Sequence, residues 1–566
     1  MSRAADTELR GASIAPSGET RVLQVDARDD VLIALVDLRA GAPVPFGGQT
    51  YELVSDVPAK HKFAMRDFAP GDAVTMYGVV VGRASKSIRR GERITVLNLK
   101  HDAAGYRVEG VGRPWRAPDV ARWRQRTFAG YVRPDGQVGT RNYWLVVPLV
   151  FCENRNVAVL KQAFEEELGF AAPQAQRRHV AELAQLFRAG KSDAIREYRF
   201  RPETQAGVAP RLFENIDGVK FLIHEGGCGG TREDTTNLCG LLAGYIHHPN
   251  VAGATVLSLG CQHAQVEILH QEIQRRDPNF RKPLLVFEQQ QMGSEATMLA
   301  EATRATFVAL MEANRAQREP APLAKLCLGL KCGGSDGFSG ITANPALGHV
   351  SDLMAALGGT TILSEFPELC GVEQELIHRS TNSEVAERFA ALMGDYAARA
   401  RAVRAAFDMN PSPGNIKDGL ITDAMKSAGA AKKGGTSPVT GVLDYPEYVS
   451  NAGLNLQCTP GNDVECVTAQ VGAGANVVLF TTGLGTPTGN PVAPVVKIST
   501  NSELPRRMPD IIDVDTGPIL SGAMTVEQAG EQILEQVLRV ASGEAKTKAE
   551  LLRQDDFIPW KRGVSL

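Results

Sequence analysis

From Gly130 onward, short apolar runs alternate with amphipathic helical patterns, and this alternation constrains the fold of the 566-residue chain more than any other feature. Apolar runs at 144–151, 218–224 and 254–260 are each followed by a helical pattern. Such alternation predicts a mainly parallel sheet covered by helices. Ligands of parallel sheets collect at the carboxyl ends of the strands, so we expect chemistry in the loops after these runs.

The chain is too long for one hydrophobic core, since cores stop growing at roughly 250–300 residues. Turn signals and composition divide it into a disordered start, a small β-rich domain, a connector rich in Gly, Pro and Arg, and two α/β domains. In residue numbers the predicted parts are 1–19, 20–105, 106–127, 128–320 and 321–566. The charged stretch 170–213 is interpreted as a solvated flank without recognisable chemistry.

The charge of the chain favours a small-molecule partner. A formal net charge of −3 and a pI near 6.4 give no long-range attraction to nucleic acid or to an anionic membrane. The N-terminal segment contains neither the apolar core of a signal peptide nor a membrane-spanning stretch. We therefore expect a cytosolic protein without nucleic-acid or membrane partners, and a homo-oligomer is possible.

The nine cysteines are dispersed and form no paired CxxC cluster, which argues against a disulfide scaffold and against a structural zinc site. Cys327 and Cys466 lie in apolar runs and are expected to act as small hydrophobic residues. Cys152, Cys228 and Cys261 instead follow predicted strands and sit beside polar residues. These three occupy the positions where ligands of parallel sheets collect.

Two loops of the middle domain carry candidate binding groups. Arg141, followed by Asn142, could clamp a substrate carboxylate through two parallel hydrogen bonds, or could form a structural ion pair. The loop from His224 to Arg232 packs His, Glu, Cys and Arg among glycines, whose backbone amides can approach an anion closely. Cys261 precedes a second histidine, and thiolate and imidazole ligands suit iron or zinc.

The loop from Lys331 to Gly340 holds the most varied set of candidate catalytic groups, since it places a lysine, a thiol, a carboxylate and hydroxyls together. A lysine with a lowered pKa can remove a proton next to a carboxylate. A helix cap would explain Ser335 or Asp336, but it would not explain Lys331 and Cys332 beside them.

Two further segments carry weaker signals. Carboxylates at 365–373 could bind a metal, although a favourable helix start explains them as well. The glycine- and threonine-rich run 481–501 offers donors for a polyhydroxy acid.

Together with NPSPGN at 410–415, KKGGTSP at 432–438, FTTGLGTPTG at 480–489 and PDIIDVDTG at 509–517, these loops resemble the altronate/galactarate dehydratase family. The resemblance is closest to its altronate dehydratases, and residues 56–84 resemble the small SAF domain of that family. The resemblance covers the chain from about residue 20. It implies an iron(II)-supported lyase that removes water from a sugar acid, converting D-altronate to 2-dehydro-3-deoxy-D-gluconate.

The resemblance fixes no role for an individual residue, so the roles that follow are hypotheses, with the site expected between the middle and last domains and the small domain as a possible cap. Lys331 is the candidate base and Asp336 the candidate acid. The remaining candidates are Ser335 and His61 for catalysis, Arg141, Asn142, Arg232, Thr482 and Asn344 for substrate binding, and His224, Cys228, Cys261 and Cys332 as metal ligands. The expected cofactor is Fe(II), with an iron–sulfur cluster on Cys228, Cys261 and Cys332 or Mn(II) as alternatives.

The chain departs from the family pattern at three places: Thr95–Asn98 replaces an H-x-H-N sequence, Gln262 replaces a common Glu, and Ala424-Met425 replaces an acidic pair. These departures leave other substrates open, among them galactarate, other aldonates and sulfolactate. A non-catalytic sugar-acid sensor is the alternative of a different class, and it would not need Lys331, Cys332 or Asp336.

Overall fold

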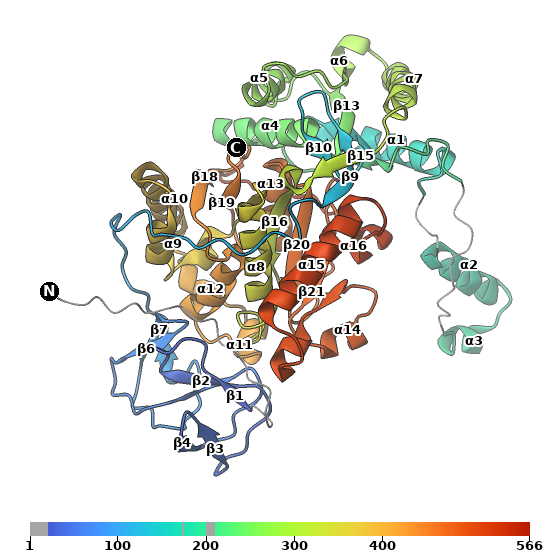
Figure 1. Ribbon diagram of the computed structural model, residues 1–566. Helices are drawn as coiled ribbons and strands as arrows, with labels where there is room; N and C mark the ends of the chain where they lie inside the picture. The colour runs from blue at the N-terminus through green and yellow to red at the C-terminus, as the bar shows by residue number, and fades with distance from the viewer. Residues whose placement is uncertain (1–20, 172–174, 200–209, 566) are drawn as a thin grey trace.

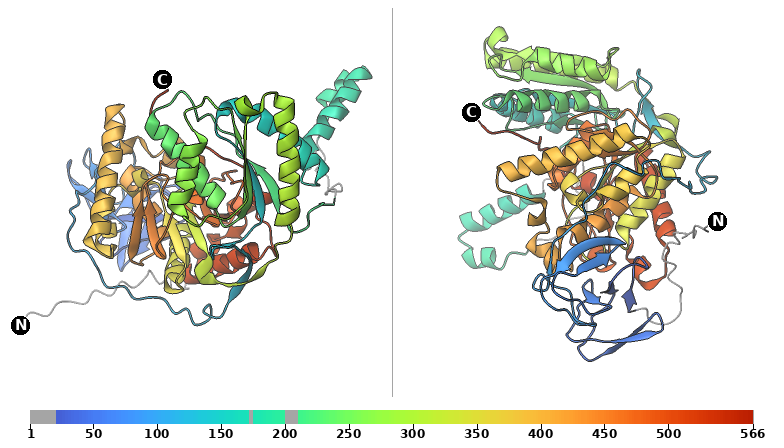
Figure 2. Two further views of the ribbon diagram at one scale, coloured as in Figure 1. Left: turned by 90° about the horizontal axis from the view of Figure 1, so that it is seen from above. Right: turned by 90° about the vertical axis from the view of Figure 1, so that its left-hand side faces the viewer.

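A computed structural model describes residues 21–171, 175–199 and 210–565. The chain forms three parts, and the C-terminal part lies between the other two (Figures 1 and 2). This arrangement brings the small N-terminal domain and the middle domain against opposite sides of one large α/β domain.

The N-terminal domain consists of short antiparallel strands, because its apolar residues alternate with polar ones between tight turns. Leu32, Val44, Tyr51 and Phe63 form part of its core. Its strands are β1 (Val22–Leu23), β2 (Val31–Ala34), β3 (Pro43–Phe46), β4 (Gln49–Glu52), β5 (Lys62–Ala64), β6 (Ala73–Met76), β7 (Val79–Ala84) and β8 (Leu99–Lys100).

The connector runs along the C-terminal domain in extended form and is fixed at several points. The buried Trp123 is flanked by Arg122 and Arg126, which pair with Glu535. A small antiparallel sheet, β10-β9-β15, then joins the beginning of the middle domain to its end. Its strands are β9 (Thr127–Val132), β10 (Val138–Gly139) and β15 (Glu319–Pro322).

The middle domain contains a four-stranded parallel sheet in the order β12-β11-β13-β14. Its strands are β11 (Tyr143–Pro148), β12 (Gly218–Phe221), β13 (Val251–Ser258) and β14 (Leu284–Glu288). Its helices are η1 (Phe151–Glu153), α1 (Asn154–Glu167), α2 (Ala175–Arg188), α3 (Ser192–Arg196), α4 (Arg232–His247), α5 (Val266–Arg276), α6 (Gln289–Met292) and α7 (Glu295–Ala313). Helices α2 and α3 project to one side and bury no residue (Figure 1), although Arg178 of α2 lines a cavity between the middle and last domains.

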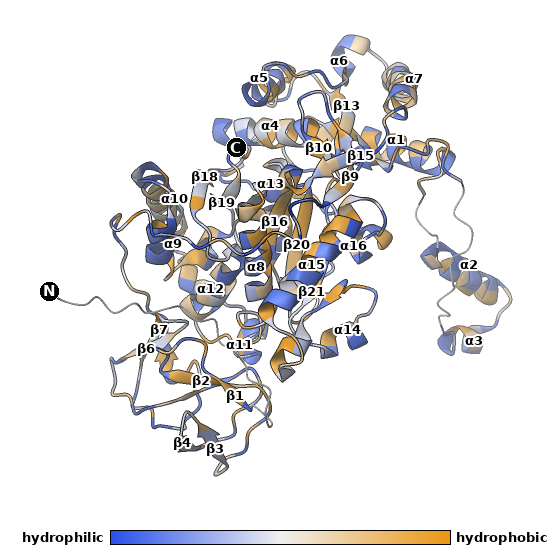
Figure 3. Ribbon diagram, in the orientation of Figure 1, coloured by the Kyte–Doolittle hydropathy of each residue, from blue (hydrophilic) through white to orange (hydrophobic). Residues whose placement is uncertain are grey.

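The C-terminal domain is built on a seven-stranded parallel sheet, β18-β19-β17-β16-β20-β21-β22. Its central strands are buried along their length and mostly apolar (Figure 3), since helices cover both faces. The strands are β16 (Cys327–Cys332), β17 (Thr360–Leu363), β18 (Val439–Leu443), β19 (Gly453–Gln457), β20 (Val477–Thr482), β21 (Val495–Ser499) and β22 (Val514–Asp515). The predicted fold class, a β-rich domain followed by mainly parallel α/β domains, is confirmed.

The helices of this domain include α8, which packs against α15, and α13, which packs against α4 of the middle domain. Their bounds are η2 (Leu323–Lys325), α8 (Ala343–Ala356), η3 (Phe366–Leu369), α9 (Glu373–Arg379), α10 (Ser383–Ala402), η4 (Phe407–Met409), α11 (Pro413–Lys417), α12 (Asp423–Ala431), η5 (Lys432–Gly434), α13 (Asp463–Gly472), α14 (Glu503–Arg507), η6 (Gly517–Ser521), α15 (Val526–Ala541) and α16 (Lys548–Leu551). Among the described residues, no helix is long and apolar enough to cross a membrane.

Candidate active site

Buried charged groups concentrate at the carboxyl edge of the seven-stranded sheet. Strand β16 ends in Lys331 and Cys332, and the loop after the neighbouring strand β17 carries Glu365 and Glu368. The four residues are at most 3% exposed. Buried charges are costly unless they are paired, so the partners of these groups define what the site can do.

Lys331 and Lys433 share Glu365. The Lys331 ammonium contacts the Glu365 carboxylate and lies 2.9 Å from Asp463 Oδ1. The Lys433 ammonium donates to Glu365 Oε2 at 3.0 Å and to the Cys332 sulfur at 2.7 Å. Two buried cations therefore hold one carboxylate and one thiol in place.

A third lysine completes the network on the Glu368 side. The Lys426 ammonium donates to Glu368 Oε1 at 2.7 Å and to Asn410 Oδ1 at 3.0 Å, while Asn410 Nδ2 donates to Glu368 at 3.2 Å. Three ammonium groups thus face three carboxylates, with Asp463 as the third. The network is neutral in sum, which explains how the domain tolerates so many buried charges.

The pKa values in this network are strongly perturbed. Burial alone would lower the pKa of Lys331, but Glu365 and Asp463 outweigh it and raise the pKa well above its ordinary value. Burial and the Glu368 charge raise the pKa of Glu365. Although burial opposes it, the Lys426 ammonium lowers the pKa of Glu368 to about 2. Lys331 is consequently an ammonium ion, and Glu365 is the carboxylate of the pair that takes up a proton more readily.

Backbone strain marks two residues of this region. Glu365 has a φ of 71° and Lys60 a φ of 75°, in the left-handed region that side chains other than glycine rarely adopt. The Glu365 amide is held by the Thr459 hydroxyl at 3.0 Å. Strain of this kind persists only where the surroundings impose it, and it clusters at functional sites.

A second polar group forms around Asp336, where the small domain meets the large one. Asp336 Oδ1 accepts hydrogen bonds from the hydroxyls of Ser339 and Thr500 at 3.1 and 3.0 Å. Lys60 of the small domain lies with its ammonium 3.1 Å from Asp336 Oδ2 and 2.8 Å from Asp418. The small domain therefore supplies a cation to a buried carboxylate of the large domain.

The two residues after Lys60 also contact the large domain. The His61 ring nitrogen Nε2 lies 3.0 Å from the Lys417 carbonyl oxygen, and burial lowers the pKa of His61. The Lys62 ammonium nitrogen lies 2.8 Å from the carbonyl oxygen of Gly419. Burial lowers the pKa of Lys62 to about 7, so this group can exchange a proton near neutral pH.

Three more predicted residues lie at the same edge of the sheet, in different settings. Ser335 is buried, and its carbonyl accepts a hydrogen bond from Asn415. The Thr482 hydroxyl accepts from the Gly485 amide at 3.0 Å. Asn344 bonds to Thr481 at 2.7 Å and to a backbone carbonyl, so both ends of its amide already have protein partners.

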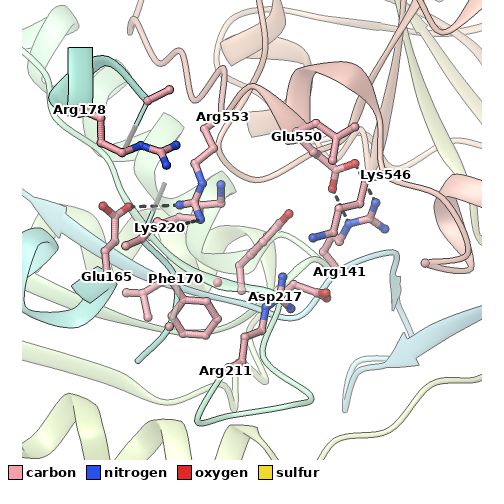
Figure 4. Close-up of a pocket in the computed structure, with 18 residues that line it drawn as sticks. Arg141, Glu165, Phe170, Arg178, Arg211, Asp217, Lys220, Lys546, Glu550 and Arg553 are labelled. Carbon is pink, nitrogen blue, oxygen red and sulfur yellow. Dashed lines mark hydrogen bonds and ion pairs between the residues drawn. The ribbon is translucent and has the colours of Figure 1, made fainter. Parts of the chain in front are cut away.

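Arg141 and Asn142 lie elsewhere, at the amino ends of the middle-domain strands. The Arg141 guanidinium forms two parallel hydrogen bonds with Glu550, at 2.7 and 2.9 Å, within a cavity of about 810 Å³ between the middle and last domains (Figure 4). Asn142 donates to two backbone carbonyls and accepts from Arg133. The structure brings neither residue to the Lys331 network.

His224, Cys228, Cys261 and Arg232 lie at the carboxyl edge of the middle-domain sheet. Both ring nitrogens of His224 contact the backbone, at the Pro148 carbonyl and the Gly226 amide, and the ring is 3% exposed. Cys228 and Cys261 are exposed, whereas Cys332 is buried in the other domain. The predicted metal ligands are therefore divided between two sites.

Cys332, Glu365 and Glu368 form one of the groups in the described residues whose ligand atoms all lie within 4.8 Å of one another. A thiolate with two carboxylates is a donor set that iron accepts. However, the lysine network already donates to each of these three groups. In this arrangement the residues do not fit a divalent iron ion, because its charge would meet three ammonium groups.

Sequence reasoning did not assign Lys433, Lys426, Asp463 or Lys60 to the site, whereas it placed Lys62, with His61, within reach of the site from the small domain. Lys433 lies in the KKGGTSP motif and Lys62 beside His61, so both positions carried a signal. For Glu365 and Glu368, the sequence left two interpretations open, metal binding and a favourable helix start. Cys327 and Cys466 are buried, as their apolar surroundings predicted.

Family models match the chain in three segments that follow one another. They describe residues 20–102 as the altronate/galactarate dehydratase SAF domain and 130–314 as the second domain of D-galactarate dehydratase/altronate hydrolase. Residues 323–565 match the C-terminal domain of D-galactarate/altronate dehydratase.

Full-length relatives lead to the same conclusion. Altronate dehydratase of Bacillus subtilis is 34% identical over 92% of this chain and 95% of its own length. Altronate dehydratase of Escherichia coli is 33% identical over 96% and 99%, and galactarate dehydratase (L-threo-forming) of Escherichia coli is 30% identical over 93% of each chain. The predicted resemblance is thereby confirmed, and the chain belongs to the altronate/galactarate dehydratase family.

Proposed function

We propose that this protein is a sugar-acid dehydratase, a hydro-lyase whose preferred substrate is an aldonate, D-altronate, with 2-dehydro-3-deoxy-D-gluconate as the product. The observation that carries the proposal is the buried network of Lys331, Lys426 and Lys433 with Glu365 and Glu368 at the carboxyl edge of the large sheet. Family membership supports the reaction class, and the names of the two altronate dehydratase relatives support altronate.

Removal of water from a 2,3-dihydroxy acid needs a base for the C2 proton and cations for the charge that develops on the carboxylate. Buried ammonium groups are suited to the second task, since their attraction is little screened by water. The high pKa of Lys331 assigns it to this task, although its sequence context suggested a base. Glu365, with its raised pKa, is the proton acceptor in this proposal.

The departing C3 hydroxyl needs a proton. We assign this role to the Lys60–Asp336 pair, in which a protonated ammonium lies 3.1 Å from the carboxylate. Ser335 and Thr482, which lie at the same edge, are the proposed partners of the sugar hydroxyls. The product enol then converts to the 2-keto acid.

We propose iron as a cofactor, but Cys332 is not its ligand. Fe(II) would supply a Lewis acid to the reaction, and Mn(II) is the alternative. Neither fits among the three ammonium groups of the Lys331 network.

The function is tested by incubating anaerobically purified, iron-loaded protein with a panel of aldonates and aldarates and measuring 2-keto acid formation. Preferred turnover of altronate supports the proposal. Preferred turnover of galactarate or another sugar acid would support the dehydratase reaction with a different substrate. If no acid of the panel is turned over but sulfite is released from sulfolactate, the reaction is sulfonate elimination and not dehydration. If neither the panel nor sulfolactate reacts, a sensor is favoured.

The assignment of roles is tested by exchange of the C2 proton in deuterated water, followed by NMR. Glu365→Gln is expected to abolish both exchange and elimination, because the proton acceptor is lost. Asp336→Asn is expected to slow elimination while exchange continues. If the C2 proton still exchanges in Glu365→Gln, another residue is the base.

A further inference from the structure

We propose that the cavity of about 810 Å³ between the middle and last domains binds a phosphorylated small molecule with a polyhydroxy body, and that Arg211 and Lys546 hold its phosphate group. This interdomain cavity is a second site. It is lined by the first residues of β11 and β12, Tyr143 and Gly218, and by no residue of the Lys331 network. The proposal does not rest on the dehydratase function.

The wall of the interdomain cavity carries more positive than negative side chains. Six basic side chains line the cavity against three acidic ones (Figure 4). A concave surface with an excess of one sign concentrates the electric field and attracts ions of the opposite sign. The basic side chains are Arg141, Arg178, Arg211, Lys220, Lys546 and Arg553.

Carboxylates of the protein already compensate half of these basic groups. Their charges are therefore paired before any ligand enters. Buried Arg141 illustrates this, since it forms two parallel hydrogen bonds with one carboxylate. The three pairs are Arg141 with Glu550 at 2.7 Å, Lys220 with Asp555 at 2.8 Å and Arg553 with Glu165 at 3.8 Å.

Arg211 of the middle domain and Lys546 of the last domain lack such a partner. Arg211 donates one long hydrogen bond, of 3.4 Å, to a backbone carbonyl. In the part of the chain that the structure describes, neither cation forms an ion pair with a carboxylate. Burial and the Arg211 charge lower the pKa of Lys546, although Glu550 and Asp217 oppose them. Two like charges that are close enough to repel each other indicate a place for an anion.

The two cations match a phosphate better than a carboxylate. A single carboxylate is satisfied by one guanidinium, as Glu550 is by Arg141. A phosphate ester carries a charge of about −1.5 to −2 at pH 7 and has three acceptor oxygens. A guanidinium binds two of these oxygens at once, and an ammonium acts as a point charge. The Arg211 guanidinium also lies 5.7 Å from the centroid of the Phe170 ring, which restricts its position before binding.

The rest of the cavity suits a polyhydroxy body. The Asp217 and Glu165 carboxylates line it with side chains that are 22% and 20% exposed, so they can accept hydrogen bonds from hydroxyl groups. The cavity volume lies within the range of about 300–1,000 Å³ typical of small-molecule sites, which is far more than a free phosphate ion fills. Because Arg211 and Lys546 belong to different domains, the bound molecule should stabilise the contact between them.

The test is isothermal titration calorimetry and thermal unfolding of the full chain with glucose 6-phosphate, inorganic phosphate and glucose, at about pH 7.5, where the ester is a dianion. None of these probes has a carboxylate, so none resembles a sugar-acid substrate. We expect glucose 6-phosphate to bind and to raise the melting temperature. Inorganic phosphate should bind about tenfold more weakly or less, because it leaves the rest of the cavity unfilled, and glucose should not bind.

Variants locate the site. Arg211→Met and Lys546→Met should each weaken the affinity for glucose 6-phosphate by about tenfold or more, the loss of one charge-assisted hydrogen bond. Arg211→Lys keeps the charge and should keep part of the affinity. Arg304→Met, which removes an exposed pair with Glu301 on α7, and Lys433→Met in the catalytic network should bind like the wild type. Melting temperatures without ligand show that each variant is folded.

Four results would overturn the site: no binding of glucose 6-phosphate, unchanged affinity in both Arg211→Met and Lys546→Met, equal affinity for glucose, or loss of binding in Lys433→Met. Equal affinity for inorganic phosphate would reduce the site to one for the free ion and overturn the polyhydroxy ligand. Failure of the proposed function is separate, because binding is measured without a sugar acid. A protein that binds glucose 6-phosphate through Arg211 and Lys546 but turns over no sugar acid retains the site and loses the dehydratase.

Discussion

At the scale of single residues, Lys433 is the most informative position, because its ammonium bonds both Cys332 and Glu365. Lys433→Met should lower kcat by about 100-fold or more, the cost typical of losing one charge-stabilising donor. Lys282→Met is the matched control, since Lys282 is also buried but donates only to two backbone carbonyls of the middle domain. Steady-state kinetics on both variants checks this, and a wild-type kcat in Lys433→Met would remove the lysine from the mechanism.

Lys62 gives a prediction about pH. Its pKa is about 7 in the folded protein because of burial and 10.5 in the unfolded chain, so between these values the unfolded state holds one more proton. Stability attributable to this group therefore rises with pH across that window, by at most about 1.4 kcal/mol per pH unit. Relative to Lys62→Met, the wild type should gain melting temperature from pH 7 to 9. A constant difference between the two would contradict the low pKa.

At the scale of elements, the turn before β5 connects the small domain to catalysis, since Lys60 bridges Asp336 and Asp418. Lys60→Met should lower kcat/KM by at least about 100-fold, the lower end of the typical contribution of a proton-transferring group. Arg39→Met is the control, because the Arg39–Asp56 pair lies exposed within the small domain. If both variants had equal kinetics, the small domain would serve only to cover the site.

At the scale of the whole molecule, the Arg141–Glu550 pair joins the middle domain to the last helix. Arg141→Met removes the buried guanidinium partner of the half-buried Glu550 carboxylate and should cost up to about 3–5 kcal/mol, seen as a lower melting temperature with KM unchanged. Arg122→Met removes two exposed ion pairs, each of which contributes at most about 1 kcal/mol. A raised KM with unchanged melting temperature would instead support a carboxylate clamp.

The sequence by itself determined the types of element and their order. Alternation of apolar runs with helical patterns is a local property, because side-chain direction repeats every two residues in a strand and every 3.6 in a helix. It therefore predicted both parallel sheets, and it located Cys152, Cys228, Cys261 and Lys331 at or next to strand ends. The motifs at 331–340 and 432–438 predicted the family for the same reason, since each is continuous in the chain.

Only the tertiary structure decided which of these groups meet. Lys331 and Glu365 are neighbours because β16 pairs with β17, while Lys433, in η5 and 101 residues beyond Cys332, reaches Glu365 and Cys332. Arg141 pairs with Glu550, which lies 409 residues later in the chain. Such contacts depend on sheet order and domain packing, to which local patterns contribute nothing, and for that reason the lysine network emerged only from the fold.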